Sequence, residues 1–480
     1  MKKILIVSDS VMKCTGYGIV SRNIINKLLS TNKFEIAQLG LNNASSSVDL
    51  PIHYYTIIKD HSRCCGKGSV IEYTRPDKKL VFLKTQPLAE EHPDQRACYK
   101  GNPVGAEAFG YNSVYFIINH FKPDIVVPIN DLWGLYNTAY IRNRESYKLV
   151  PYLAIDSECM FPVIKQIAPG LPPIDMISTI GSADKVIVCT EWSKEVLNKT
   201  CRILFNKEFN NISIIPYGVD TSMWKPLTNR DELRKLYFDI GPETFLLGTV
   251  SRNQPRKRFD AILQTARIFI DKYENKTKKL KIYFHCQPYE DIGWDLPWLA
   301  KYYGIDDRCI FNNELKPGEG PSIEHLNELV NCFDAHMLLS NSEGWGLSLI
   351  ETAAAGIPNI TTKYSAMADW GKDTLLFAKV AAYEHEGKTG FVKALVDVEH
   401  AAKQLQLLYA SPKMCREYGT KGVKLGQKLD WNKVTDEWVE LLDSIPLDFK
   451  EDRFKDLDPE KIAKELEEIQ NQQLNLRYMP

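Results

Sequence analysis

The chain has 480 residues, of which 44% are apolar, enough for two to four domains that each bury a substantial core. Its 60 basic residues nearly cancel its 61 acidic ones, so no global field would recruit nucleic acid or an anionic membrane. The 11 cysteines are scattered without a CxxC pair, which argues against a disulfide framework and against a zinc site. The first apolar run, Ile4 to Val7, is too short for the core of a signal peptide, and no run reaches the length of a membrane span. These features predict a soluble cytoplasmic protein with no bound metal.

The first half of the sequence alternates short β-branched runs with longer amphipathic ones. The run KILIVS at 3–8 predicts a buried strand, and a glycine-containing turn separates it from a helix predicted over about 19–29. Such alternation is typical of βα units, and so of a parallel sheet covered by helices on both faces. Further strands of this first set are predicted at 34–40, 124–130, 150–156, 185–190 and 212–218.

Residues 60–112 depart from this rhythm. The stretch is rich in Gly, Pro, Lys and His, and it holds one clear strand, at 80–85. A long irregular insertion of this kind is usually functional or disordered.

The strand pattern restarts after residue 240. A polar segment at about 222–240, which contains Pro226, joins the two sets of strands and is a plausible domain boundary. Two doubly wound α/β domains in succession are therefore predicted, over residues 1–222 and 223–430. The second set of strands is predicted at 245–251, 281–286, 309–313, 335–340 and 358–362.

Two helices are predicted within residues 431–480. The first covers 431–445. The second covers 456–475, where Pro459 suits a first helical turn and one apolar stripe runs through Ile462, Leu466 and Ile469. We expect the second helix to lie on the first domain, and a coiled-coil partner is the alternative.

Residues 342–358, SEGWGLSLIETAAAGIP, follow an apolar run that should end near Ser340, at the carboxyl edge of the second sheet. Open α/β sheets bind ligands at that edge, and glycines let the backbone approach a ligand closely. Ser348 and Glu351 form an S-x-x-E capping box, which predicts a helix N-terminus here and gives Glu351 a purely structural alternative role. Glu343 precedes the expected N-cap, so helix capping is not an alternative role for it. The amides of the helix N-terminus suit a phosphate and the carboxylates suit hydroxyls, so a phosphorylated sugar or ribose fits both.

A second candidate site is GTVSRNQPRKRFD at 248–260, directly after another predicted strand. Pro255 bends the stretch between Arg252 and Lys257, so both cations could reach one anion. A guanidinium fork and an ammonium together can neutralise a diphosphate. The neighbouring Arg256 and Arg258 are predicted to be solvated, as charge runs usually are.

The third candidate is CTGYGIVSRN at 14–23, between the first strand and the first helix. Gly16 and Gly18 resemble a phosphate-binding turn. The third glycine of the dinucleotide fingerprint is missing, and no acidic residue ends the next strand, so NAD binding is disfavoured.

Together these elements resemble the retaining glycosyltransferases of family 4. That family has the GT-B fold, in which two Rossmann-like doubly wound α/β domains face a central cleft. The E-x7-E motif runs from Glu343 to Glu351, and the Arg–Lys pair is Arg252 and Lys257. The segment IPYGVDTSMWKP at 215–226 looks like the one that leads into the second domain of the family.

The resemblance implies a role for each motif. Glu343 would contact the hydroxyls of the donor sugar and Glu351 would hold the ribose, while Arg252 and Lys257 would bind the donor diphosphate. The other donor-binding residues that it implies are Gly16 and Gly18 from the first domain, Asn312 and Leu315 beside the base, and the backbone of Gly344, Trp345, Gly346 and Leu347.

On the acceptor side, Asp131 and Asp156 end strands of the first domain, and Asp131 is also a catalytic candidate. Helix capping or turn chemistry is the alternative for each. The resemblance also implies that the closing helix, with Trp431 and Trp438, crosses back to pack on the first domain.

The resemblance extends over about 185–445, and the N-terminal half matches only in its first turn and strand pattern. Trp345 replaces the commoner Phe, and Ser348 stands where Pro is frequent. A histidine often found in the cleft of the first domain has no clear match.

The implied reaction moves a hexose from a UDP- or GDP-sugar to an acceptor hydroxyl with retention of configuration. Fixed cations at the leaving diphosphate make a metal unnecessary, and no cofactor is implied beyond the donor. The acceptor would be a glycan, a lipid or a protein-linked glycan, chosen chiefly by the 60–112 insertion, and peripheral membrane contact stays open. The alternatives are a GT-B sugar-nucleotide epimerase, a phosphorylase, or a non-catalytic sugar-nucleotide-binding subunit.

Overall fold

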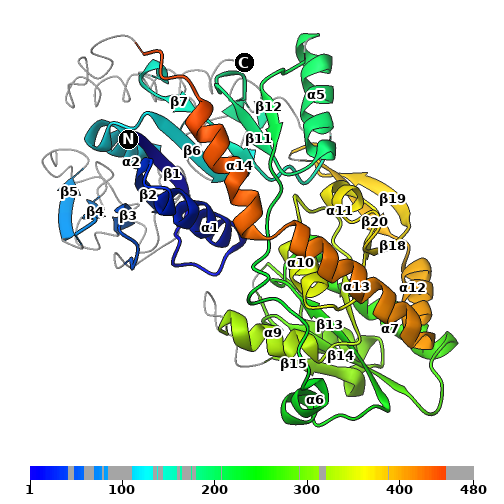
Figure 1. The fold of residues 1–480 in the computed structure, drawn as a ribbon. Coiled ribbons are helices and arrows are strands. Elements are labelled where there is room, and N and C mark those ends of the chain that lie inside the picture. Colours follow the sequence, from blue (N-terminus) through cyan, green and yellow to red (C-terminus); the bar gives the residue numbers. More distant parts are fainter. Residues whose placement is uncertain are drawn as a thin grey trace, which may run out of the picture.

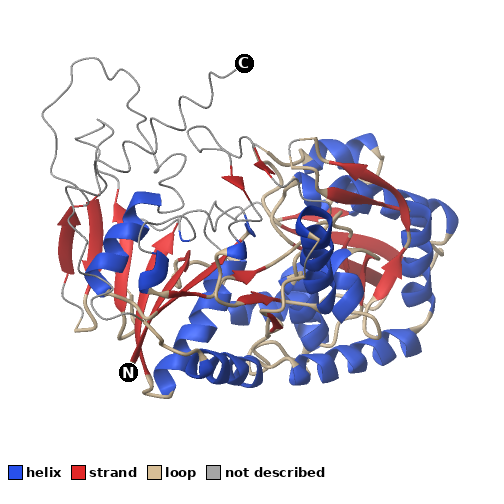
Figure 2. Ribbon diagram, turned by 90° about the horizontal axis from the view of Figure 1, so that it is seen from above, coloured by secondary structure: helices blue, strands red, loops and turns tan. Residues whose placement is uncertain are grey.

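The computed structural model describes residues 1–41, 48–58, 70–77, 80–84, 111–132, 138, 144–158, 163–164, 174–175, 180–206, 208–290, 292–312, 321–387 and 389–449. Figure 1 shows two lobes, each built on a sheet, with α13 and α14 running from one lobe to the other. Figure 2 shows the strands of the two lobes gathered on opposite sides of the molecule. Most of the predicted 60–112 insertion and the predicted helix at 456–475 lie outside the described residues.

The first lobe is built on a sheet whose central strands are parallel. β1 (Lys2–Asp9) pairs with β2 (Phe34–Leu41) on one side and with β6 (Ile125–Asn130) on the other. The strand order is β12-β11-β8-β6-β1-β2-β3-β4-β5, with β7 beside β6, and β4 and β5 are antiparallel to their neighbours. The other strands of the lobe are β3 (His53–Ile58), β4 (Val70–Thr74), β5 (Leu80–Lys84), β7 (Lys148–Leu149), β8 (Tyr152–Leu153), β11 (Val186–Val188) and β12 (Ile212–Ile214), and a separate short pair is β9 (Val163–Ile164) with β10 (Ile174–Asp175).

Helix α1 (Gly16–Ser30) begins three residues earlier than predicted. Thr15 is its N-cap, because its side-chain oxygen accepts a hydrogen bond from Gly18 N–H at 3.2 Å. Val20, Ile24 and Leu28, spaced four apart, bury one face of the helix in the core. The other helical segments of the lobe are α2 (Tyr111–Phe121), α5 (Glu191–Phe205) and the 3-10 turn η3 (Arg144–Ser146).

The second lobe has a parallel sheet in the order β15-β14-β13-β16-β17-β18. All five predicted strands are present, β18 is an additional one, and the predicted α/β fold class is confirmed. The strands are β13 (Thr244–Val250), β14 (Lys279–His285), β15 (Cys309–Phe311), β16 (Ala335–Leu338), β17 (Asn359–Thr362) and β18 (Leu376–Ala378), followed by an antiparallel hairpin of β19 (Val380–His385) and β20 (Val392–Val396). The helices are α6 (Arg230–Phe238), α7 (Phe259–Lys272), α8 (Leu296–Tyr302), α9 (Ile323–Asn331), α10 (Leu347–Ala354), α11 (Ser365–Trp370), α12 (Val398–Ala410) and α13 (Pro412–Lys428), with the short turn η5 (Asp306–Arg308).

The chain passes between the lobes at two points that lie side by side. Val219 N–H donates to the carbonyl of Leu429 at 2.9 Å, and Trp431 N–H donates to the carbonyl of Val219 at 3.1 Å. A Cβ on Gly218 would come within 2.6 Å of the Trp431 ring. The segment that leaves the first lobe therefore needs glycine at 218 to fit against the segment that returns to it at Trp431.

Helix α14 (Trp431–Ser444) follows the second crossing and lies along α1 of the first lobe (Figure 1). Trp438 is fully buried, and its ring centroid lies 4.9 Å from that of Tyr152 in an edge-on contact. Lys2 Nζ donates to the carbonyls of Leu442 and Ile445, at 3.1 and 2.8 Å, which satisfies the end of the helix. The boundaries predicted at 222 and 430 stay predictions.

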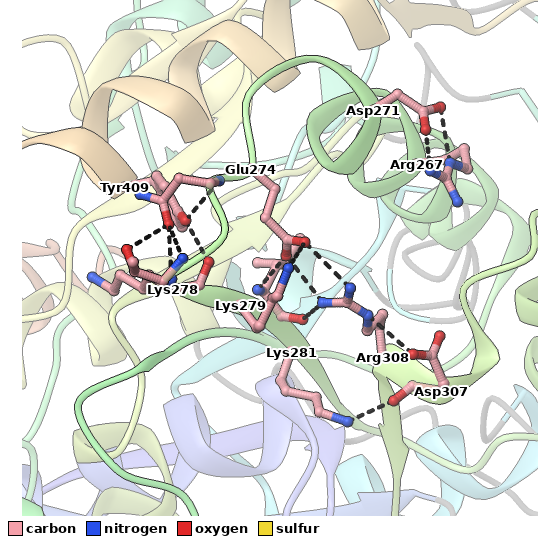
Figure 3. A network of polar contacts seen from close by, with 12 residues as sticks. Arg267, Asp271, Glu274, Lys278, Lys279, Lys281, Asp307, Arg308 and Tyr409 are labelled. Atoms are coloured by element: carbon pink, nitrogen blue, oxygen red, sulfur yellow. Dashed lines mark hydrogen bonds and ion pairs between the residues drawn. The ribbon is translucent and has the colours of Figure 1, made fainter.

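A network of charged residues closes the amino edge of the second sheet (Figure 3). The carboxylate of Glu274 accepts hydrogen bonds from Leu280 N–H at 2.7 Å and from Arg308 at 3.0 Å. Tyr409 donates to the carbonyl of Lys278. These contacts fix the start of β14 and leave the carboxyl edge of the sheet as the place to look for a ligand.

Among the described residues no helix combines the length and apolarity needed to cross a membrane.

Candidate active site

The loop after β13 supplies the two cations that contact Glu343. It forms a 3-10 turn, η4 (Pro255–Lys257), and the fixed φ of proline suits its first position. Lys257 Nζ donates to Glu343 Oε1, and Arg256 Nη1 lies 2.8 Å from Glu343 Oε2. Each oxygen of one carboxylate therefore faces its own cation.

Glu343 is a rigidly held anion. It is buried, Ser340 Oγ donates to its Oε1 at 2.7 Å, and the Ser365 hydroxyl bonds its backbone N–H and C=O at 3.0 and 2.9 Å. Burial alone would raise the pKa of Glu343, but the charges of Arg256 and Lys257 outweigh it and lower the pKa to about 2. The carboxylate is thus ionised throughout the physiological range.

Lys257 is the more deeply buried of the two cations, with 11% of its side chain exposed. Burial is the largest effect on the pKa of Lys257 and lowers it, and the nearby charge of Arg256 lowers it further. Glu343 acts in the opposite direction, and the resulting pKa is about 8. The ammonium remains mostly protonated at neutral pH and keeps its bond to the carboxylate.

Arg256 was predicted to be solvated, and 38% of its side chain is exposed, but it also pairs with the buried Glu343. The turn begun by Pro255 brings two consecutive residues to the same carboxylate, and Arg256 also donates to the carbonyl of Ser342 at 3.3 Å. Arg258, which was also predicted to be solvated, is more buried: 22% of its side chain is exposed, and it pairs with Asp260 at 2.8 Å.

Arg252 pairs with Glu290 in this structure. Its Nε lies 2.9 Å from Glu290 Oε2, and 64% of its side chain is exposed. The next residue, Asn253, is fully buried and bonds both the N–H and the carbonyl of Trp294, at 2.9 and 2.7 Å. Asn253 thereby holds the loop before α8 against the predicted phosphate loop, while the predicted role of Arg252 itself stays a prediction.

Helix α10 starts without the predicted capping box. Its N-cap is Gly346, in the left-handed region with a φ of 87°, and no side chain makes a capping hydrogen bond. Ser348 is the second residue inside the helix and so stands too late to cap it. The glycine conformation ends the preceding loop earlier than the sequence pattern indicated, and it leaves the first N–H groups of α10 without a side-chain cap.

Glu351 is the fifth residue of α10, so it does not cap the helix N-terminus, and the purely structural role that the capping box offered does not apply. Its burial raises the pKa of its carboxyl to about 7. In the described part of the chain, no group hydrogen-bonds to this carboxyl group.

The lobes touch at two of the glycines that the sequence singled out. A Cβ on Gly344 would lie 2.7 Å from both the carbonyl oxygen and the Cβ of Ala154, across the interface. A Cβ on Gly16 would lie 3.2 Å from Leu347 Cδ1 of the other lobe. Gly18 instead faces its own lobe, where a Cβ would lie 2.5 and 2.8 Å from two backbone oxygens of the preceding loop.

Asp131 follows β6 and accepts a hydrogen bond of 2.6 Å from the Tyr17 hydroxyl. Burial raises the pKa of Asp131 to about 6, and this bond and the charge of Arg256 oppose the rise. Arg256 also acts electrostatically on Asp156, so its guanidinium links the acids of the first lobe to Glu343 of the second.

Asp156 lies 3.9 Å from Lys393 Nζ, which comes from β20 of the second lobe. Lys393 also donates to Ser157 Oγ at 3.1 Å and to Ser342 Oγ at 3.0 Å, one hydroxyl from each lobe. Lys393 was not expected from the sequence, because no strand pattern predicted the hairpin that carries it. Tyr17 was not expected either, because the phosphate-binding pattern at 14–23 depends on the glycines on both sides of it and assigns no role to the residue between them.

The remaining predicted donor residues have other surroundings. The ring of Trp345 is buried and stacks on Trp370, with centroids 5.2 Å apart. Asn312 follows β15 and donates to the Tyr283 hydroxyl at 3.3 Å. Leu315 lies outside the described residues.

In the described ranges, no three His, Cys, Asp or Glu side chains come together as metal ligands would.

Two Rossmann-like lobes that meet at the edges carrying these charged loops define the GT-B fold of glycosyltransferases. Residues 298–425, which hold Glu343 and Glu351, match the model of the family Glycosyl transferases group 1.

Two curated relatives have related names. The chain is 22% identical over 232 residues to D-inositol 3-phosphate glycosyltransferase of Acidothermus cellulolyticus, covering 48% of this chain and 49% of that protein. It is 24% identical over 127 residues to the putative glycosyltransferase EpsD of Bacillus subtilis, covering 26% of this chain and 30% of that protein. The chain thus spans about half the length, or less, of these relatives.

Solved structures resemble the chain over nearly its whole length. Sucrose-phosphate synthase of Thermosynechococcus elongatus superposes with a TM-score of 0.62 at 13% identity, covering 92% of this chain and 98% of that one. Anabaena HepE, in complex with UDP and glucose, gives a TM-score of 0.60 at 12% identity, covering 93% and 100%. At these identities the likeness establishes the shared fold.

Proposed function

We propose that the protein is a retaining glycosyltransferase of family 4 that moves a hexose from a UDP- or GDP-sugar to an acceptor hydroxyl. The observation that carries the proposal is the Glu343 carboxylate held between Lys257 and Arg256, with Asp131 and Asp156 on the facing lobe. The family match around Glu343 and the glycosyltransferase names of the curated relatives support this class of reaction.

The donor diphosphate would bind between the loop after β13 and the start of α10. Lys257 and the uncapped amides of α10 supply positive charge there. Arg252 donates to Glu290 through Nε, and within the described ranges its two terminal nitrogens make no hydrogen bond, so they are available to a phosphate. These groups would replace a metal ion, and the reaction would need no cofactor beyond the donor.

The two glutamates would bind hydroxyls. Glu343 keeps lone pairs beyond those used by its two cations, and a sugar hydroxyl can donate to them. Glu351 has a pKa near neutrality, and two ribose hydroxyls donating to it would favour its ionised form. Asn312 and Leu315 are proposed to lie near the base.

The reaction would proceed by direct transfer on one face of the sugar. The bond from the anomeric carbon to the diphosphate oxygen breaks, and a bond from that carbon to the acceptor oxygen forms. The acceptor proton passes to the departing phosphate oxygen, so no carboxylate nucleophile is needed. Lys257, fixed beforehand, stabilises the charge that develops on the leaving group, commonly a large term in catalysis.

The acceptor would bind against Asp131 and Asp156, at the carboxyl edge of the first sheet. A glycan, a lipid or a protein-linked glycan can present the required hydroxyl. The cytoplasm is the proposed location.

Nucleotide release tests the proposal. The full chain is incubated with UDP-, GDP- and ADP-sugars, with and without an acceptor panel, and the nucleoside diphosphate is separated by chromatography. We expect release from one donor to depend on the acceptor and to be lost in Glu343→Gln. Epimer formed without an acceptor would indicate the epimerase, phosphate-dependent release the phosphorylase, and saturable binding without turnover the non-catalytic subunit, and each would overturn the proposal.

A further inference from the structure

We propose that Tyr17 is a positioning residue for the reaction, because its hydroxyl holds Asp131 through Oδ1 and leaves Oδ2 for the acceptor hydroxyl. This inference rests on the proposed function, in which Asp131 binds the acceptor. The hydrogen bond joins the first turn of α1 to the end of β6, 114 positions apart in the sequence.

The backbone around Tyr17 is fixed on both sides. The following Gly18 packs so closely on the preceding loop that a Cβ would lie 2.5 Å from a backbone oxygen, and its N–H is capped by Thr15. The Ser21 hydroxyl donates to the carbonyl of Tyr17 at 2.7 Å. The glycines that resembled a phosphate-binding turn thus set the position from which Tyr17 reaches across the edge of the sheet.

Asp131 is fixed in turn by few contacts. Its N–H donates to the side chain of Asn130 at 2.8 Å, which orients the backbone. Among the described residues, Tyr17 is the one that hydrogen-bonds the carboxylate itself, at 2.6 Å. Removal of the phenolic hydroxyl would therefore release the Asp131 side chain and leave its backbone in place.

The charge on Asp131 depends on the same bond. Among the described residues, five groups face it: Tyr17 from α1, Asp9 from β1, Asp156 from the segment after β8, Arg256 from η4, and Tyr217 from the segment after β12. Burial and the two other carboxylates favour the neutral acid, whereas Tyr17 and Arg256 favour the ionised form. The pKa of Tyr17 is raised well above its ordinary value by burial, so the phenol stays a donor at every pH of interest.

If Tyr17 had a purely structural role, removing its hydroxyl would affect the protein no differently from removing another buried hydroxyl of the same lobe. Its ring packs against a buried apolar cluster that includes residues of both lobes, and Tyr17→Phe keeps that packing. Tyr54→Phe is the matched control, because it removes another buried hydroxyl of the same lobe, one that donates to Ser10 Oγ at 2.7 Å. A general loss of packing would affect both variants alike.

The kinetic experiment measures kcat between pH 5 and 8 at saturating donor. For Tyr17→Phe we expect kcat at pH 7 to fall by about tenfold, the usual effect of one hydrogen bond to a charged group. We expect an acid limb set by Asp131, whose pKa burial raises to about 6, to move to higher pH, while KM for the donor and the Tyr54→Phe profile stay unchanged. An unshifted acid limb in Tyr17→Phe would overturn the inference.

A second measurement needs no turnover and so separates this inference from the proposed function. The carboxyl carbon of Asp131 is titrated by NMR in protein labelled at aspartate, with Asp131→Asn giving the assignment. We expect the midpoint to rise in Tyr17→Phe and to stay in place in Tyr54→Phe. An equal midpoint in Tyr17→Phe and the wild type shows that the phenol does not govern the carboxylate, whatever the activity assays give.

Discussion

Lys257→Ala removes the buried ammonium that faces Glu343 and, in the proposed reaction, the leaving diphosphate. Loss of one preorganised group at a developing charge commonly costs about 3 kcal/mol of transition-state stabilisation, or roughly a hundredfold in rate. We therefore expect kcat to fall by about a hundredfold at saturating donor. The decrease should appear in kcat because the charge develops as the bond breaks.

The substitution also weakens the support of Glu343 in the folded protein. Complete loss of the partner of a buried ion costs roughly 3–5 kcal/mol. Glu343 retains Arg256 at 2.8 Å and the Ser340 hydroxyl at 2.7 Å, so the loss should be smaller, about 1–2 kcal/mol. The variant should therefore stay folded at room temperature, with a lowered thermal midpoint.

The assay compares donor turnover and thermal melts of the wild type and three variants. Lys235→Ala is the matched control, since its ammonium pairs with Asp239 on the exposed face of α6, and it should keep full activity. Lys257→Arg retains the positive charge and should keep more activity than Lys257→Ala. A folded Lys257→Ala protein with wild-type kcat at saturating donor would refute the assignment of this ammonium to the leaving group.

Three further outcomes are expected. Gly344→Ala should separate the lobes, because its Cβ would meet Ala154 at 2.7 Å, and a radius of gyration from X-ray scattering equal to that of the wild type would contradict this. Glu343→Gln should lower the free energy of unfolding at pH 7. The pKa of Glu343 falls from 4.5 to about 2 on folding, so the stability that its ionised carboxylate contributes is present above about pH 4.5 and is lost toward pH 2. If the difference in thermal midpoint between the wild type and Glu343→Gln does not shrink as the pH is lowered, the ion pairs do not stabilise the fold. EDTA should leave turnover unchanged, and a strict need for a divalent ion would mean that the fixed cations do not suffice.

The sequence was sufficient to predict the fold because its strongest signals are local. Buried parallel strands produce short β-branched runs, and every run assigned to the second lobe became a strand. The elements that were not predicted have weak local patterns. Strand β18 has three residues, and β19 is largely exposed, so neither presents the apolar run that marks a buried strand.

The candidate site was predictable in its location and less so in its contacts. Glu343 and Lys257 were expected at the carboxyl edge of the sheet, and the structure places them in contact. Arg252 and Lys257 were expected to act together, but Arg256 is the second cation that contacts Glu343, because the turn at Pro255 directs the side chains in a way that residue spacing does not reveal. The failure of the capping box has a similar cause, since the conformation of Gly346 decides where α10 begins.

The two crossings between the lobes have a consequence for engineering. Val219 and Asp430 form a parallel bridge, so the whole stretch between them leaves the first lobe and re-enters it within one strand spacing, about 5 Å. A chain segment whose two ends are neighbours can be exchanged for a homologous one without threading or lengthening any connection. The junction beside Gly218 and Trp431 is therefore the natural place to graft a nucleotide-binding half from another GT-B protein and to learn which half selects which substrate.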